Sequence, residues 1–138
     1  FNELLDFVKQ ARIERLGAFK YSEEEGTYGA ENFRDSIPAA TKQKRLDKLM
    51  SLQSEISLEF NKSRVGSVEK VIVDDYSDGV YVCRSEFESP EVDGEILVKY
   101  DKDVMQNVEP YSLIGEFINV KITGADEYDL IAEPIELL

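Results

Sequence analysis

The chain has 138 residues and a formal net charge of −13 at pH 7, with one cysteine and no histidine. One cysteine cannot form an internal disulfide or supply the several cysteine ligands of an iron–sulfur cluster. The lack of histidine excludes imidazole metal sites and Ser-His or Cys-His nucleophile pairs. No apolar run approaches the roughly 18 residues of a membrane span. We therefore expect a small cytoplasmic domain, alone or with a remnant of another.

The negative charge is concentrated in the second half of the chain. Residues 1–65 hold 11 basic and 11 acidic side chains, whereas residues 66–138 hold 5 basic and 18 acidic ones. Such a surface repels a phosphate backbone, which nucleic-acid-binding proteins neutralise with Lys and Arg. It favours a basic protein partner, although acidic surfaces also serve solubility alone.

The first part of the chain predicts a helix over residues 1–12, followed by a strand over residues 16–21. The helix has four apolar residues at helical spacing, namely Leu4, Leu5, Val8 and Ala11. The chain opens with Phe1 inside this helical pattern. We therefore expect it to be an excised piece of a larger protein.

A long loop and a long helix come next. Residues 22–38 include Gly26, Gly29 and Pro38, which indicates a loop longer than most. Residues 38–63 contain no internal Gly or Pro and predict a helix with an apolar stripe. Its first half carries Lys42, Lys44, Arg45 and Lys48. These residues form either a solvated face or a contact for phosphate or an acidic protein patch.

Short runs rich in Val, Ile and Tyr follow, separated by Gly, Asp and Pro. They predict five strands, over residues 65–75, 80–84, 95–100, 116–123 and 129–134. Asp78-Gly79 predicts a two-residue hairpin turn, because both positions need positive φ. Alternate residues such as Ile118, Val120 and Ile122 share one face. We expect a small antiparallel barrel or sandwich, with Cys83 as a buried apolar residue.

Three segments together resemble a known family. Residues 84–94, RSEFESPEVDG, resemble the signature of a TRAM domain, in the variant found in RimO-type methylthiotransferases. Residues 16–27, LGAFKYSEEEGT, look like the last strand and loop of the radical-SAM barrel of these enzymes. Residues 45–57, RLDKLMSLQSEIS, look like the helix that joins the barrel to the TRAM domain. The resemblance covers essentially the whole chain in the same order.

This resemblance implies an α+β fold. A C-terminal, OB-like, five-stranded antiparallel β-barrel, the TRAM domain, would occupy residues 65–138. A linker helix would occupy residues 38–64, and the terminal αβ unit of a radical-SAM barrel residues 1–37. Family members attach a methylthio group to the β-carbon of an aspartate in small-subunit ribosomal protein twelve, using two 4Fe-4S clusters and S-adenosylmethionine. We expect the cluster ligands to lie elsewhere in the parent enzyme, so that this chain is non-catalytic and without cofactors. We also expect the chain to be monomeric.

The candidate site residues are acidic, with one exception. The loop after residue 84 has no basic side chain and is the expected contact for the basic ribosomal protein. The predicted substrate-binding residues are Arg84, Glu86, Glu88, Glu91 and Asp93. For Arg84, an internal ion pair with Asp or Glu is favoured over contact with a substrate carboxylate or backbone. In the parent enzyme, the rim of the active site would include Ser22, Glu23, Glu25 and Thr27.

A transfer-RNA adenosine methylthiotransferase is the alternative family branch. The TRAM domains of these relatives bind RNA and would be expected to be more basic. The aromatic side chains that could stack on bases, if they lie outside the barrel, are Tyr76, Tyr81, Phe87 and Tyr100. A third possibility is a purely structural barrel that shields the active site.

Overall fold

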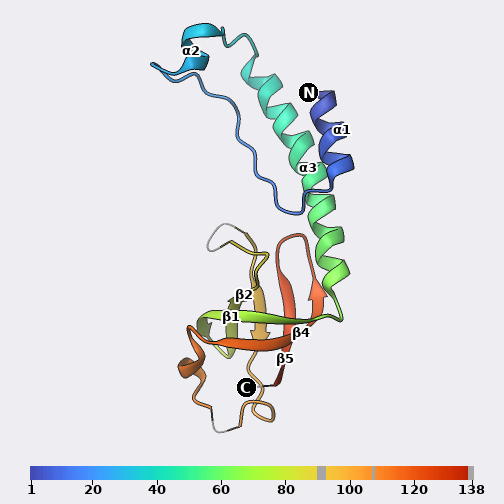
Figure 1. Ribbon diagram of the computed structural model, residues 1–138, viewed down its shortest axis with the longest axis vertical. Coiled ribbons are helices and arrows are strands. Elements are labelled where there is room, and N and C mark those ends of the chain that lie inside the picture. Colours follow the sequence, from blue (N-terminus) through green and yellow to red (C-terminus); the bar gives the residue numbers. More distant parts are fainter. Residues whose placement is uncertain (90–92, 107, 137–138) are drawn as a thin grey trace. The chain divides into compact units, whose positions relative to one another are not determined.

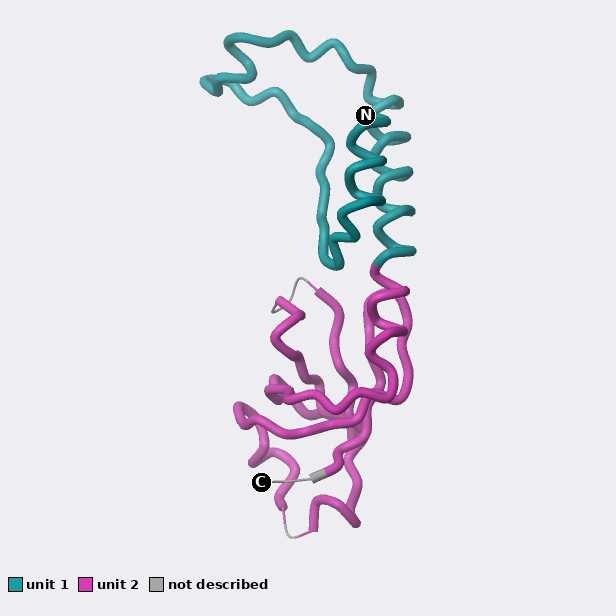
Figure 2. The backbone as a smooth tube through the Cα atoms, turned by 45° about the vertical axis from the view of Figure 1, so that its right-hand side comes forward, with its two compact units in different colours: residues 1–56 teal, residues 57–138 magenta. Residues whose placement is uncertain are grey.

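The computed structural model describes residues 1–89, 93–106 and 108–136 and divides the chain into two compact units (Figures 1 and 2). Residues 1–56 form the first unit and residues 57–138 the second. The helix α3 (Ala39–Arg64) begins in the first unit and ends in the second.

The first unit contains helix α1 (Asn2–Ala11) and most of α3, as the sequence predicts. Val8, Leu49 and Ile56 form its small buried core. The Gln53 side-chain amide donates to the backbone carbonyls of Ile13 and Glu14, at 2.9 and 3.1 Å. These bonds attach the segment that follows α1 to α3.

The strand predicted over residues 16–21 is wrong. This segment is extended but belongs to no sheet, because no described segment offers it a partner strand. Its Tyr21 carbonyl instead accepts a hydrogen bond from Lys42 Nζ at 3.0 Å. The following loop contains a short helix that the sequence did not predict, α2 (Tyr28–Asn32). Thr27 caps this helix, since its Oγ1 accepts from the Ala30 amide at 3.2 Å.

The second unit is a closed five-stranded barrel with the strand order β1-β2-β3-β5-β4. The strands are β1 (Val68–Ser77), β2 (Val80–Arg84), β3 (Ile96–Lys99), β4 (Phe117–Ala125) and β5 (Leu130–Glu136). A 3-10 helix, η1 (Pro110–Leu113), precedes β4. All five predicted strands are present, with ends shifted by a few residues at most.

The expectation of an entirely antiparallel barrel needs one correction. Four of the strand pairs are antiparallel, but β3 and β5 pair in parallel, with Ile96 opposite Leu130. The reason is geometric: strand direction cannot alternate all the way around a ring that has an odd number of strands. One pair must run in the same direction, and here it is the pair that closes the barrel.

Local signals in the sequence are confirmed in the barrel. Asp78 and Gly79 have φ of 50° and 81°, as the predicted hairpin between β1 and β2 requires. Every second residue of the strands points inward, so that Ile118, Val120 and Ile122 are buried together. Cys83 is also buried, at 1% exposure.

Candidate binding site on the barrel

A concave, acidic surface lies across β1, β2 and the residues directly before β3 and β5. We call it the acidic hollow; it has a volume of about 690 Å³. Its lining residues are Asp74, Asp75, Val82, Cys83, Arg84, Ser89, Asp93, Gly94, Glu95 and Asp129. Five of these side chains are carboxylates and only one is basic. The lining of the hollow is therefore predominantly negative.

Local hydrogen bonds fix two of these carboxylates. Asp93 Oδ2 accepts from the Ser89 amide at 2.8 Å. Asp129 Oδ1 accepts from the Glu95 amide, also at 2.8 Å, and so connects the start of β3 to the turn before β5. Oxygen atoms held by the backbone stay in place without side-chain ordering when a ligand binds.

Arg84, a predicted contact, forms an internal ion pair. Its Nε donates to both carboxylate oxygens of Asp74, at 3.1 and 2.8 Å. The pair is partly exposed, with 32% of the Arg84 side chain and 39% of the Asp74 side chain accessible. Arg84 thus forms the internal ion pair that the sequence analysis favours for it, and it also lines the hollow.

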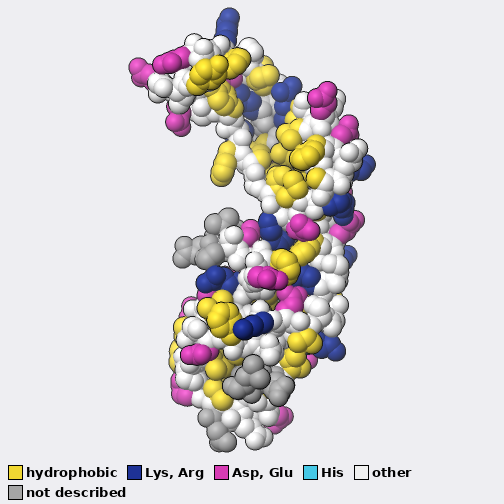
Figure 3. Space-filling view, viewed as in Figure 1, with side chains coloured by type: hydrophobic (Ala, Val, Ile, Leu, Met, Phe, Trp, Pro, Cys, Tyr) yellow, Lys and Arg dark blue, Asp and Glu magenta, His cyan; other side chains and the backbone are white. Residues whose placement is uncertain are grey.

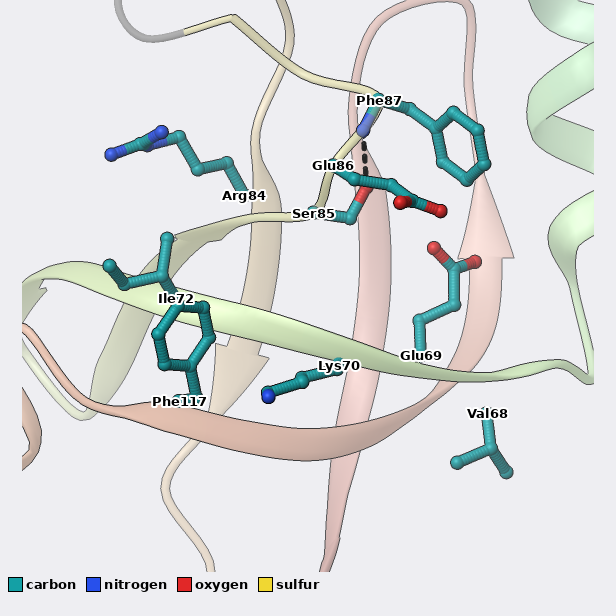
Figure 4. A pocket seen from close by; sticks show the side chains of 9 residues that line it. All are labelled: Val68, Glu69, Lys70, Ile72, Arg84, Ser85, Glu86, Phe87 and Phe117. Carbon is teal, nitrogen blue, oxygen red and sulfur yellow. Dashed lines mark hydrogen bonds between the residues drawn. The ribbon is translucent and has the colours of Figure 1, made fainter.

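A second hollow of about 510 Å³ adjoins the first, since Arg84 lines both. We call it the aromatic hollow. Its other lining residues are Val68, Glu69, Lys70, Ile72, Ser85, Glu86, Phe87 and Phe117 (Figure 4). Phe117 is 58% exposed and lies under Lys70, whose Nζ is 4.7 Å from the ring centroid. Figure 3 shows hydrophobic and charged side chains intermixed on the second unit.

A buried polar group lies between helix α3 and the loop that follows β2. We call it the Arg64 cluster; its members are Arg64, Glu69, Ser85 and Glu88. The Arg64 guanidinium donates to Glu69 through Nη2 and Nε, at 2.7 and 3.1 Å, and to Glu88 through Nη1. The other carboxylate oxygen of Glu88 accepts from the Ser85 amide at 2.8 Å and from its hydroxyl.

Aromatic rings flank this guanidinium. Arg64 lies over the rings of Phe60 and Phe87, at 5.4 and 5.1 Å from their centroids, and these rings contact each other edge-to-face. The Arg64 side chain is 6% exposed and that of Glu88 is 2% exposed. The ion pair and its hydrogen bonds to Ser85 keep the pKa of Glu88 below its usual range and outweigh the effect of burial.

The structure thus separates the predicted substrate-binding residues. Asp93 lines the acidic hollow, Glu86 lines the aromatic hollow, and Arg84 lines both. Glu88 is buried in the Arg64 cluster, where its carboxylate accepts hydrogen bonds from Arg64 and Ser85 instead of facing solvent. Glu91 lies outside the described residues.

The four residues predicted to form an active-site rim lie in the loop of the first unit. Ser22, Glu23 and Glu25 are exposed, and Thr27 caps α2. Glu23 and Glu25 border a shallow hollow of about 480 Å³ together with Gly26, Ala30 and Glu31. The role of these residues in a longer enzyme stays a prediction.

Sequence reasoning missed the Arg64 cluster and the exposed Phe117. The spacing of Phe60 and Arg64, one helical turn apart, was the available signal for the stacked guanidinium. The partner Glu88 stood in a loop that is acidic throughout, so nothing in the sequence marked it as buried.

Among the described residues, no group of three or more His, Cys, Asp or Glu could hold a metal ion. The helices within the same residues are too short or too polar to cross a bilayer.

A closed five-stranded barrel of this kind places the second unit in the class of OB-like barrels. Residues 65–135 match the TRAM domain family, and the chain belongs to this family.

Curated relatives extend the match beyond the barrel. The chain is 50% identical over 132 residues to the ribosomal protein uS12 methylthiotransferase RimO of Phocaeicola vulgatus, and 47% identical over 135 residues to that of Bacteroides fragilis. It is 44% identical over 136 residues to the corresponding protein of Porphyromonas gingivalis. These alignments cover 96%, 98% and 99% of the chain but only 29–30% of each relative. The predicted resemblance to RimO-type methylthiotransferases is confirmed.

Proposed function

We propose that this chain is the substrate-recognition part of a radical-SAM methylthiotransferase that modifies ribosomal protein uS12. The reaction would attach a methylthio group to the β-carbon of an aspartate, as the family resemblance implies. The names of the relatives support the activity and the substrate of the longer protein. The acidic hollow supports the role of this part, because five carboxylates lining one concave surface suit a basic ribosomal protein.

Catalysis belongs to other segments of such an enzyme. The two 4Fe-4S clusters of the family require cysteine ligands, and this chain has only Cys83. Burial raises the pKa of the Cys83 thiol to about 12, so the thiolate needed for ligation is disfavoured. The residues of this chain therefore do not fit the clusters, and its contribution is binding.

Direct titration tests this proposal. The 138-residue chain is titrated with purified uS12 at two salt concentrations, and separately with a transfer-RNA anticodon arm. We expect binding to uS12 that weakens with salt, because the attraction is between opposite charges in solvent. Binding to neither partner would contradict a recognition role for this part of the enzyme.

Charge-reversal variants locate the contact. Asp93→Lys combined with Glu95→Lys should weaken uS12 binding by about tenfold or more, because both side chains line the acidic hollow. Glu116→Lys combined with Glu133→Lys changes the net charge equally, at exposed positions outside either hollow. A similar loss in both double variants would show that overall charge, and not the hollow, determines affinity.

RNA binding, as in the transfer-RNA branch, remains the alternative function. Phe117 and Lys70 favour it, because an exposed ring beneath a cation can stack on a base near a phosphate. Of the four aromatic residues considered for stacking, Tyr81 is fully buried and Phe87 is 46% exposed. Binding of the anticodon arm, and not of uS12, would move the assignment to this branch.

A further inference from the structure

The Arg64 cluster lies at the base of the loop that separates the two hollows. Glu88 is a member of the cluster, and its neighbours in sequence are surface residues of the proposed site. Phe87 lines the aromatic hollow and Ser89 lines the acidic hollow. A shift of the Glu88 backbone would therefore move a wall of each hollow.

The Arg64 cluster fixes the orientation of its side chains more than it stabilises the fold. Replacing a buried ion pair by apolar residues of similar volume is often neutral or stabilising, so stability alone does not explain its presence. A planar guanidinium that donates to two carboxylates fixes their relative orientation. The contacts of Arg64 with the rings of Phe60 and Phe87 restrict the guanidinium further. Glu88 then fixes the loop backbone through the Ser85 amide.

We infer that Arg64 and Glu88 are positioning residues of the recognition site, which hold residues 85–89 so that Phe87 and Ser89 line their hollows. The inference rests on the proposed function, since it assigns the two residues a part in binding uS12. Neither side chain touches the substrate, and both act through the loop.

A double variant separates positioning from stability. Arg64→Met combined with Glu88→Leu removes the ion pairs of Arg64 with Glu88 and with Glu69, leaves the net charge unchanged and replaces the two charged side chains by apolar ones. We expect a folded barrel with a little-changed melting temperature, and uS12 binding weakened about tenfold. The matched control is Lys42→Met combined with Asp35→Leu, which removes the 2.6 Å ion pair of the first unit and should bind normally. A folded double variant with wild-type affinity would overturn the inference.

Amide hydrogen exchange gives a readout that does not depend on binding. The Ser85 amide donates to Glu88, and the Phe87 amide donates to Ser85 Oγ at 3.1 Å. In the double variant these two amides should exchange at least about tenfold faster, whereas strand amides such as Val73 keep their wild-type rate. Unchanged exchange at Ser85 and Phe87 would refute the positioning role even if the wild-type chain did not bind uS12. Failure of the wild type to bind would refute only the proposed function.

A single, nearly isosteric variant covers the case in which the double variant does not fold. Glu88→Gln keeps the size of the side chain and an acceptor oxygen for Ser85, but it loses the charge that faces Arg64. We expect uS12 binding to be about threefold weaker than in the wild type. The Ser85 and Phe87 amides should exchange at rates between those of the wild type and those of the double variant. Wild-type affinity together with wild-type exchange in this variant would overturn the inference.

Discussion

Gly94 lies against the backbone of Tyr128 so closely that a Cβ atom added to Gly94 would be 1.7 Å from the Tyr128 carbonyl oxygen. The contact connects the loop before β3 to the turn before β5. Because the neighbouring atom is backbone, it cannot rotate away as a side chain could. Only glycine fits at this point of the acidic hollow.

Gly94→Ala should therefore destabilise the barrel by about 3 kcal/mol, as strand β3 or the turn before β5 moves to relieve the overlap. Urea unfolding followed by circular dichroism measures the change. Gly17→Ala is the control, because a Cβ atom there meets no other atom within 4 Å. Equal stability of the two variants would contradict the close approach.

Alkaline pH should destabilise the barrel through the buried thiol of Cys83. The pKa of this thiol is about 12, against an ordinary value of 9.0, because burial disfavours the thiolate. A raised pKa in the folded state means that the stabilisation is complete below pH 9 and is lost as the pH rises towards 12. In that range the free energy of unfolding should fall by about 1.4 kcal/mol per pH unit more in the wild type than in Cys83→Ala.

Unfolding curves at several pH values between 8 and 11 give this difference. Tyr81, whose pKa burial also raises to about 12, is present in both proteins, so its contribution cancels. Parallel pH profiles would mean that the Cys83 thiol ionises as readily in the folded state as in the unfolded state.

Acid should weaken the barrel through Glu88. The ion pair with Arg64 and the hydrogen bonds from Ser85 lower the pKa of Glu88 below its ordinary 4.5, despite burial. A lowered pKa in the folded state gives stabilisation that is present above pH 4.5 and is lost as the pH falls below it. Glu88→Gln should cost about 2 kcal/mol at pH 7, and the difference from wild type should shrink below pH 4.5. Urea unfolding from pH 7 to pH 3 tests this, and a constant difference would contradict it.

Much of the fold could be predicted from periodicity and turn chemistry. Alternating apolar residues marked the strands, and Asp78-Gly79 marked the hairpin, because each signal depends on neighbours in sequence. The prediction of a strand at residues 16–21 was wrong because a strand depends on more than its own sequence. It exists only where another segment pairs with it. The parallel pairing of β3 and β5 depends on closure of the whole ring, and no local sequence pattern indicates how the ring closes.

The candidate site was predictable in charge but not in detail. Acidic composition marked a region whose residue Asp93 lines a hollow, and it equally marked Glu88, which is buried. Whether a carboxylate in an acidic loop faces solvent or an arginine depends on where helix α3 ends. Sequence reasoning placed Arg64 at the end of the linker helix but gave no reason to place Glu88 beside it.

The parallel pairing of β3 with β5 has a consequence for synthesis on the ribosome. Strand β5 bonds to both β3 and β4, so the ring cannot close until residues 130–136 have left the exit tunnel. Until then, β3 and β4 each have a free edge, and the nascent domain can only be an open sheet. Because its defining contacts join distant parts of the sequence, the barrel belongs among the slower topologies to fold. It would complete its folding as one of the last events of translation of this segment.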